Sequence, residues 1–285
     1  MRERLTLALA LGPALIVIVG LFFGGLAAGA LMSLNYFPLI GLTDPDFGAY
    51  RAVLGDPDIG RSFLLSLHIA FTSTVISAVL AVFAALLLRR TFWGRSFAAF
   101  LFQLNLTVPH LVGAIGVLYL FSQSGLIARM AASLGMIGAP AEFPALVYDP
   151  YAAGIILLYV WKEVPFIAVV VLANMQAVGE DHEAAARTLG AGRWAAFRHA
   201  MLPQIAPGLL SASVLVFAFA FGSYEIPALL GASWPEALPV LAWRLYSDVD
   251  LAARPQAMAL SMLVAAASLA LVLLYARLSR RLIGG

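Results

Sequence analysis

Long segments without a charged side chain constrain the fold of this chain more than any other feature. The segment from Ser62 to Leu88 is uncharged, as are Leu5 to Thr43 and Ser96 to Ala128. A helix of about 20 apolar residues is long enough to cross a bilayer. Charged residues make up 11% of the sequence and hydrophobic residues 62%, against roughly 25% and roughly 45–50% in soluble domains. The sequence therefore predicts an all-α, polytopic membrane protein.

The apolar segments divide into six predicted transmembrane helices within a single domain, 1–285. The first lies between Leu5 and Thr43, and the others cover 62–88, 97–121, 151–175, 205–226 and 255–275. A cleaved signal peptide is the alternative for the first, because Arg2 and Arg4 precede it and Ala28-Gly-Ala30 resembles a cleavage site. Its apolar stretch exceeds the roughly 7–15 residues of a signal core, which favours a retained span.

Basic residues are divided unevenly between the two sides of this arrangement. With six spans, both termini and the segment 179–203 lie on one side, together with Arg2, Arg4, Arg89, Arg90, Arg95, Arg187, Arg193, Arg198, Arg277, Arg280 and Arg281. The opposite loops hold Arg51, Arg61, Arg129, Arg244 and Arg254, with most of the acidic residues. Cytoplasmic loops carry the excess of arginine and lysine. We therefore expect a multi-pass protein with both termini and segment 179–203 in the cytoplasm.

Segment 179–203 is too polar to lie in hydrocarbon and reads as a helix-turn-helix elbow between spans four and five. Asp181 is a plausible N-cap, and Gly190 predicts the end of a first short helix, because glycine readily adopts the left-handed conformation. A second short helix follows, whose predicted apolar face consists of Trp194, Phe197 and Met201. Pro203 and Pro207 then limit where the next helix begins. An amphipathic helix that rests on lipid is the alternative.

Within this elbow, Ala-Ala-Arg-Thr-Leu-Gly190 is followed thirteen positions later by Pro203. This run resembles the loop signature of permease subunits of type I ATP-binding-cassette (ABC) importers: Glu-Ala-Ala, three residues, Gly, nine residues, Ile, any residue, Leu, Pro. The glutamate position holds Ala184, with Glu183 one position earlier, and the isoleucine position holds Ala200. The resemblance implies a cytoplasmic coupling helix whose ATPase-coupling residues are Glu183, Ala184, Ala185, Ala186, Gly190, Trp194, Phe197, Leu202 and Pro203.

The resemblance also implies the type I importer permease fold and a set of partners. These are two ATPase subunits that bind ATP and Mg, a second and different permease subunit, and an extracytoplasmic solute-binding protein, in a bacterial cytoplasmic (inner) membrane. The chain has no Gly-x-x-x-x-Gly-Lys-Ser/Thr loop, so we expect no ATPase activity and no cofactor in this chain. A stand-alone secondary transporter is the alternative, for which internal repeats with paired broken helices are expected.

Charged residues inside the predicted spans are candidates for the substrate pathway. In span four, Trp161-Lys162-Glu163 precedes Pro165, and charges at this depth usually line a polar path. The alternative is that Lys162 snorkels to the interface beside Trp161. Near the end of span five lie Tyr224 and Glu225, for which loop capping is the alternative. The surrounding Gly-Ser-Tyr-Glu-Ile-Pro-Ala-Leu-Leu-Gly resembles the branch that imports polyamines, ferric iron or thiamine, and with the acidic outer loops it favours a small cationic solute such as a polyamine.

Other polar residues of the spans receive structural interpretations. His68 and His110 are isolated histidines, for which we expect hydrogen bonds to backbone or hydroxyl groups rather than a metal. Gln103 and Asn105 are expected to form hydrogen bonds between helices, and Pro109-His110 predicts a kink in span three. With no cysteine and no nucleophile-base or His-Glu-x-x-His pattern, we predict no catalytic and no metal site. Scattered basic residues argue against nucleic acid.

Overall fold

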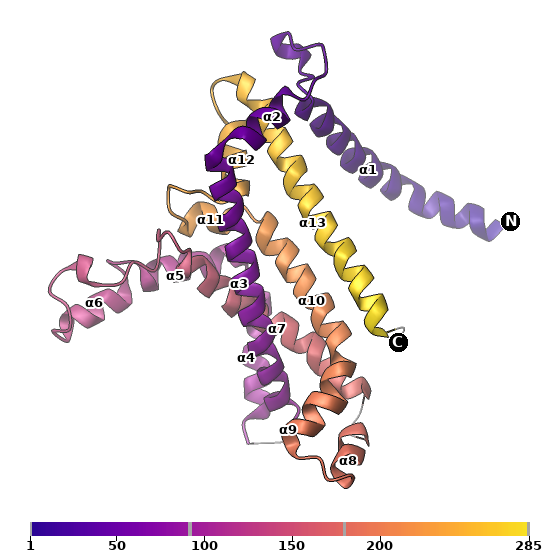
Figure 1. The fold of residues 1–285 in the computed structure, drawn as a ribbon, viewed down its shortest axis with the longest axis vertical. Helices are drawn as coiled ribbons and strands as arrows, with labels where there is room; N and C mark the ends of the chain where they lie inside the picture. The colour runs from indigo at the N-terminus through magenta and orange to yellow at the C-terminus, as the bar shows by residue number, and fades with distance from the viewer. Residues whose placement is uncertain (1, 91–92, 179–180, 284–285) are drawn as a thin grey trace. The chain divides into compact units, whose positions relative to one another are not determined.

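A computed structural model describes residues 2–90, 93–178 and 181–283, and in these ranges the chain is built from helices without β-strands (Figure 1). The predicted all-α fold is confirmed. Six helices are long and apolar enough to cross a membrane, which matches the predicted number. They are Ala10–Ser33, Pro57–Leu88, His110–Ser133, Ala153–Ala177, Arg193–Gly222 and Leu251–Leu274.

The chain forms two compact units, of which the first comprises residues 1–60 and 239–266. It contains α1 (Arg2–Ser33), the 3₁₀ turn Pro38–Ile40, α2 (Gly48–Gly55), most of α12 (Leu238–Tyr246) and the first part of α13 (Arg254–Ile283). The end of α1 is tied to α2 by a 2.9 Å hydrogen bond between the hydroxyls of Ser33 and Tyr50. Where Gly29 lies on α1, a Cβ atom would contact Met258 and Met262 of α13, so the two helices approach closely at this glycine.

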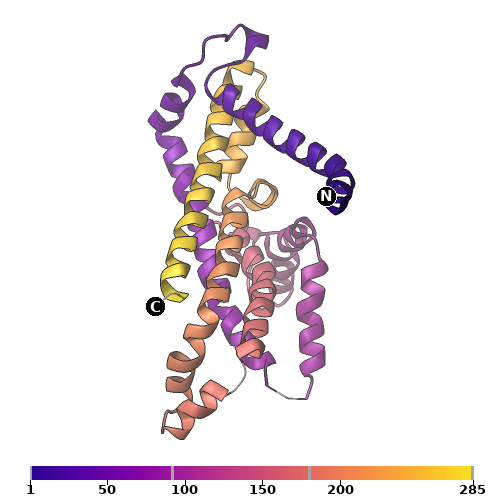
Figure 2. The same ribbon diagram turned by 90° about the vertical axis from the view of Figure 1, so that its right-hand side faces the viewer.

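The second unit, residues 61–238 and 267–285, contains all the predicted site residues. It begins within α3 (Pro57–Leu88) and continues through α4 (Arg95–Thr107), α5 (His110–Phe121), α6 (Leu126–Ser133), α7 (Ala153–Val178), α8 (Asp181–Thr188), α9 (Arg193–Ala196), α10 (Leu202–Gly222) and α11 (Glu225–Leu230). In Figure 2, α10 runs beside α7, as their packing requires.

Small residues on α3 and larger apolar residues on α7 and α10 build the core of this unit. The buried face of α3 includes Ser62, Ser66, Ala70, Ser73, Ser77, Ala81 and Ala85. Small side chains at this helical spacing let membrane helices pack closely. Against the end of this face pack Ile167, Val171 and Met175 of α7 and Ile205, Ala212 and Val216 of α10. The three helices therefore form one packed layer that leads to the elbow.

The third span is broken rather than kinked. Helix α4 ends at Thr107, Val108 is extended, and α5 begins at His110. Pro109 lacks the N–H group that a continuing helix needs and disfavours helical backbone at Val108, which explains the break. The candidate membrane-spanning segment in this region is His110–Ser133, which comprises α5 and α6 and overlaps the predicted 97–121 only from His110 onward.

Candidate functional site

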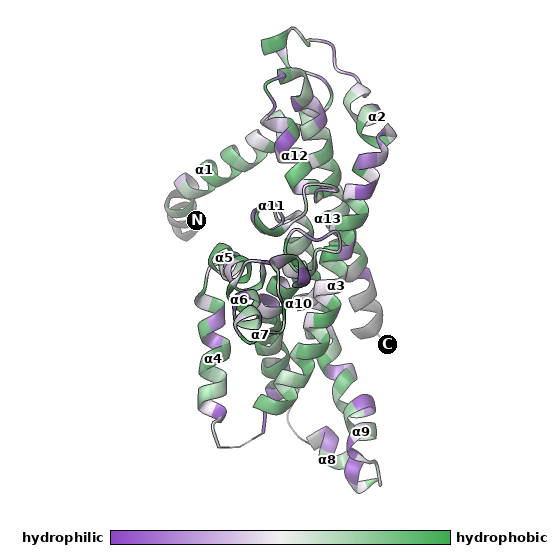
Figure 3. Cartoon of the chain, turned by 90° about the vertical axis from the view of Figure 1, so that its left-hand side faces the viewer, coloured by the Kyte–Doolittle hydropathy of each residue, from purple (hydrophilic) through white to green (hydrophobic). Residues whose placement is uncertain are grey.

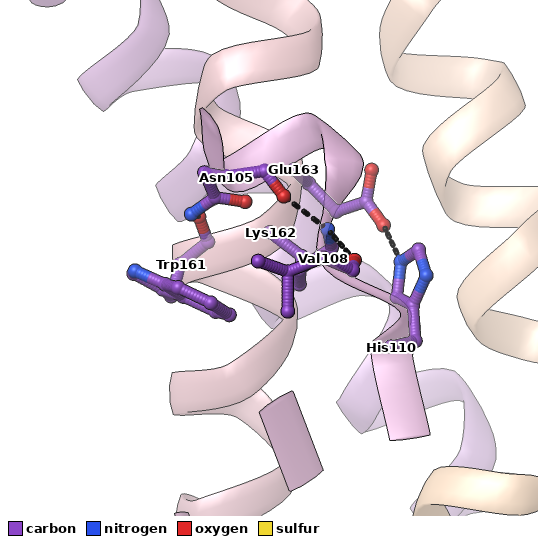
Figure 4. Close-up of polar contacts among 6 residues, drawn as sticks. All are labelled: Asn105, Val108, His110, Trp161, Lys162 and Glu163. Carbon is purple, nitrogen blue, oxygen red and sulfur yellow. Dashed lines mark hydrogen bonds and ion pairs between the residues drawn. The ribbon is translucent and has the colours of Figure 1, made fainter. Parts of the chain in front are cut away.

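The central polar group of the second unit lies where α7 faces the break in the third span (Figure 4). The Lys162 Nζ atom donates hydrogen bonds to the backbone oxygens of Asn105 at 2.7 Å and Val108 at 2.6 Å. Carbonyls at the C-terminal end of a helix have no partner within it and carry partial negative charge. Lys162, only 4% exposed, therefore caps α4 with a cation.

Glu163, the next residue of α7, contacts the other side of the same break. Its Oε1 atom lies 3.3 Å from Nε2 of His110, the first residue of α5. The positive end of a helix dipole favours a carboxylate at this position. Two adjacent residues of α7 thus hold the two helices that flank Val108 and Pro109, each with the charge that suits the helix end it contacts (Figure 4).

Asn105 supplies the bond that lets α7 continue through Pro165. Despite Pro165, α7 is a single helix over Ala153–Val178. A proline at position 165 has no N–H for the carbonyl of Trp161, four residues earlier. The Asn105 side chain donates to that carbonyl at 2.9 Å. The expected interhelical hydrogen bond of Asn105 is therefore present, and its partner is the carbonyl freed by the proline.

The two histidines of the spans differ in their contacts. His68 lies 3.2 Å from both the Tyr151 carbonyl and the Thr72 hydroxyl, which confirms the predicted hydrogen bonds. The same prediction was wrong for His110, whose partner is the Glu163 carboxylate. The imidazole of His110 also contacts the Phe219 ring of α10, with centroids 4.8 Å apart. The sequence did contain an indication of this polar cluster of Asn105, His110, Lys162 and Glu163. Pro109 and Pro165 mark the two places where backbone groups lose their helical hydrogen-bond partners.

Tyr224 and Glu225 lie at the junction of α10 and α11 and are both on the surface of the chain. Tyr224 is 39% exposed, and Glu225 is exposed in the first turn of α11. Within the ranges that the structure describes, no hydrogen bond or ion pair joins Glu225 to Lys162 or Glu163. The predicted pathway residues therefore form one buried pair, an exposed Trp161 beside it, and a separate exposed pair at the end of α10.

The first arm of the elbow, α8, ends as predicted at Gly190. This glycine has a φ of +87°, a conformation that side chains other than glycine adopt at a cost. The Gly190 N–H donates to the Arg187 carbonyl, and the Ala191 N–H donates to the Ala186 carbonyl. This pair of bonds is the Schellman arrangement, which satisfies the last carbonyls of a helix. The side chain of Asp181, the predicted N-cap, lies outside the described residues.

The second arm of the elbow runs into the fifth span without a break. Helix α9 continues through a π-helical turn, Phe197–Met201, into α10. The Leu202 N–H donates to the Phe197 carbonyl, five residues earlier. This wider turn accommodates Pro203, which sits in the first turn of α10 and lacks an N–H of its own. The second short helix and span five, which were predicted as separate helices, are therefore continuous, and α10 begins next to Pro203.

The π-helical turn also divides the predicted apolar face of the second arm. Met201 is 2% exposed within the core, whereas Trp194 is 68% exposed. Phe197 is half-buried, with its ring centroid 5.7 Å from that of Trp194. Leu202 packs at the edge of the core. Trp194, together with Leu189, which is 89% exposed, is consequently a large apolar side chain that the elbow presents outward.

The first arm is fixed to the end of α3 by an ion pair. Glu183 Oε2 lies 2.7 Å from Arg89 Nη2, and both side chains are largely buried, at 17% and 20% exposure. Ala184 and Ala185 are exposed, and Ala186 is half-buried. Among the described residues, no cluster of three or more metal-ligating side chains occurs.

Six apolar helices, charges buried against a broken span and a polar elbow that continues into the fifth span define a multi-pass membrane protein of the transport type. The chain belongs to the family of binding-protein-dependent transport system inner membrane components, whose family model matches residues 77–284. The family is that of ABC importer permeases, which confirms the predicted resemblance.

Curated relatives agree with this assignment. The chain is 30% identical over 277 residues to the thiamine transport system permease protein ThiP of Salmonella typhimurium, covering 94% of this chain and 49% of that protein. It is 31% identical over 181 residues to the molybdenum permease ModB of Mycobacterium bovis, covering 63% and 64%. It is 25% identical over 248 residues to the sulfate permease CysT of Escherichia coli, covering 85% and 86%. The chain thus spans about half the length of the thiamine permease.

Solved structures share the fold. A chain of a bacterial ABC transporter involved in the import of the acidic polysaccharide alginate superposes with a TM-score of 0.79 at 20% identity, covering 98% of this chain and 96% of that chain. A chain of the MetNI methionine ABC transporter gives a TM-score of 0.58 at 18% identity, covering 78% and 94%. At these identities the likeness concerns the fold alone.

Proposed function

We propose that this chain forms part of the translocation pathway of an ATP-driven importer and receives the force for transport through the elbow. Its partners are two ATPase subunits, a second permease subunit and an extracytoplasmic solute-binding protein. ATP and Mg bind to the ATPase subunits, and this chain performs no hydrolysis. The family membership supports the general scheme, and the geometry of the elbow supports the route of the force.

The observation that carries the proposal is the continuous helical rod from Arg193 to Gly222. The N-terminal end of this rod bears the exposed Trp194. Its C-terminal part bears Phe219, whose ring contacts His110. At 1.5 Å per residue, the separation of 25 positions from Trp194 to Phe219 spans roughly 37 Å. A displacement of the elbow therefore reaches the Glu163–His110 pair through a single continuous helical element.

In this mechanism the elbow moves with the ATPase pair, and the rod transmits that motion to the broken third span. Packed helices transmit displacement because a well-packed core compresses little. Ligand-driven switching requires contacts that differ between two states. The contact of Phe219 with His110 is suited to differ between the two conformational states, because it joins the rod to the first residue of α5.

For the solute we propose a small cation. Lys162 directs its charge to backbone carbonyls and is 4% exposed, so it does not present a cation to the pathway. Glu225, in contrast, is an exposed carboxylate. The most extensive of the three alignments is with a thiamine permease, and thiamine is a cation. The narrower expectation of a polyamine has no support among these relatives, which concern thiamine, molybdenum and sulfate.

Site-directed labelling tests the proposed position of the elbow. The chain contains no cysteine, so Arg198→Cys introduces a unique thiol on an exposed elbow residue. A membrane-impermeant maleimide is expected to label it in inverted vesicles and not in intact spheroplasts. Val249→Cys, at a residue 99% exposed between α12 and α13, is the control and should show the opposite pattern. Labelling of Arg198→Cys from outside would overturn the proposal.

Reconstitution separates this proposal from the stand-alone transporter. Proteoliposomes with this chain alone should not accumulate thiamine, putrescine, molybdate or sulfate. Accumulation should require ATP and the co-purified subunits, and should be restricted to a cationic member of this set. Uptake by the chain alone would favour a secondary transporter, and ATP-dependent uptake of molybdate or sulfate would contradict the proposed cation.

A further inference from the structure

A cavity of ≈570 Å³ lies between the end of α3 and the two arms of the elbow. Its size falls within the range of small-molecule sites, about 300–1,000 Å³. The neighbouring helices are shown in Figure 3, where α3 carries mainly hydrophobic residues and α8 and α9 carry more hydrophilic ones. Four residues of its lining, Glu183, Ala184, Trp194 and Phe197, are among those assigned to ATPase coupling, whereas its arginines are not.

One wall of the cavity is strongly basic. It contains four arginines, Arg89 and Arg90 at the end of α3 and Arg187 and Arg193 on the elbow, with one carboxylate, Glu183. Glu183 pairs with Arg89, and within the described part of the chain the other three arginines form no ion pair. Guanidinium groups bind phosphate oxygens through paired, charge-assisted hydrogen bonds. This wall therefore suits a phosphate group.

The apolar part of the lining belongs to the membrane-spanning part of α3, the helix whose end also carries Arg89 and Arg90. Phe83 and Leu86 line the cavity, and Phe83 is 63% exposed. Phe83 lies five residues before the end of α3 at Leu88, and Arg90 follows two residues after that end. Phe83 is therefore set back from the end of α3 by roughly 8 Å along the helix axis. A soluble anion would leave this apolar wall in contact with water, whereas a lipid chain would cover it.

We propose that this cavity binds an anionic phospholipid of the cytoplasmic leaflet, with its phosphate among Arg90, Arg187 and Arg193 and an acyl chain along Phe83 and Leu86. The proposal rests on the proposed cytoplasmic position of the elbow, because basic residues attract anionic lipids at that surface. A bound lipid joins the end of α3 to both arms of the elbow. Trp194, which also lines the cavity, is a residue type that is enriched at membrane–water interfaces.

Native mass spectrometry of the full-length chain, purified with its ATPase, tests the proposal with phosphatidylglycerol and phosphatidylcholine as probes. The Arg90→Gln/Arg193→Gln variant removes two cavity arginines. The matched control, Arg129→Gln/Arg198→Gln, removes two exposed arginines that do not line the cavity. Wild type and control should retain phosphatidylglycerol preferentially. The cavity variant should bind it roughly 30-fold more weakly, at about fivefold for each arginine lost.

Three results would overturn the proposal. Equal retention of the two lipids, or equal loss in the two double variants, would remove the specific site. Displacement of phosphatidylglycerol by millimolar inorganic phosphate would assign the arginines to a soluble anion. Loss of the ATPase from the cavity variant with unchanged phosphatidylglycerol binding would assign them to the partner subunit. The labelling experiment tests the proposed function separately: labelling of Arg198→Cys from outside the cell would overturn that function, whatever the lipid measurement shows.

Discussion

The side chain of Asn105 donates a hydrogen bond to the carbonyl of Trp161, the backbone group that Pro165 leaves without a helical partner. A polar side chain of one span thus repairs the hydrogen-bond ladder of another. In a bilayer, where water cannot take over this role, such repair is a condition for a continuous helix. With this bond α7 continues as one helix and presents Lys162 and Glu163 to the break between α4 and α5.

A double-mutant cycle tests this relation. Asn105→Ala should lower the free energy of unfolding by about 1–3 kcal/mol, because it leaves a buried carbonyl unsatisfied. In a Pro165→Ala background the backbone N–H of residue 165 can bond to that carbonyl, so Asn105→Ala should cost less. Denaturation of the four proteins in one detergent measures the coupling. Equal costs in both backgrounds would contradict the assigned role.

Lys162 is expected to be important for stability. Lys162→Met keeps the length of the side chain but leaves the Asn105 and Val108 carbonyls without their cationic donor. We expect a loss of about 2–5 kcal/mol from these two buried acceptors, measured as a lower unfolding midpoint. Lys162→Arg retains a cation and should be less damaging. If Lys162→Met were as stable as wild type but failed to transport, Lys162 would be a solute ligand instead.

Gly190 should tolerate asparagine better than valine. Its φ of +87° is costly for a β-branched residue and less so for asparagine, while no neighbouring atom lies within 4 Å of an added Cβ. Gly190→Val should therefore distort the elbow and reduce co-purification of the ATPase, with insertion into the membrane unchanged. Gly190→Asn should retain most of the ATPase. The quantity to measure is the molar ratio of ATPase to permease after affinity purification, and equal ratios would argue against a docking elbow.

The Arg89–Glu183 pair should position α8 more than it stabilises the fold. Both side chains keep some contact with solvent, and ion pairs near the surface contribute about 0.2–1 kcal/mol. Glu183→Arg should place two cations together and reduce ATP-driven transport, while the exchange Arg89→Glu/Glu183→Arg should recover part of it. A transport assay with the unfolding midpoint as control distinguishes positioning from folding. No recovery in the exchanged protein would indicate that Glu183 acts on another group.

Phe219 should affect coupling without affecting assembly. Phe219→Ala removes the ring that contacts His110, so the rod should transmit less motion to α5. We expect ATP hydrolysis to continue with less solute transported per ATP, and the ATPase to remain bound. Phe217→Ala, which removes a ring that stacks on Phe221 instead, is the matched control. An unchanged ratio of transport to hydrolysis in Phe219→Ala would exclude this route for the force.

Much of the fold was predictable because the hydrocarbon core of a bilayer permits few backbone conformations. Uncharged segments such as Ser62 to Leu88 must span as helices, and Gly190 marks a helix end that requires a positive φ. The contacts of the candidate site could not be predicted from the sequence as well. His110 was assigned a backbone or hydroxyl partner, and its carboxylate partner Glu163 lies 53 residues away in the sequence. Side-chain spacing along one helix carries no information about which break in another helix it faces.

The sequence by itself determined the class of the protein: six spans, a polar elbow between the fourth and fifth, and the spacing from Gly190 to Pro203. These follow from local chemistry, since apolar length, proline and glycine act on the backbone where they occur. Only the tertiary structure decided that α9 continues into α10, that Asn105 serves the carbonyl freed by Pro165, and that Lys162 and Glu163 hold opposite sides of one break. The reason is physical, because a buried polar group must find its partner in space, and that partner is supplied by whichever helix packs against it.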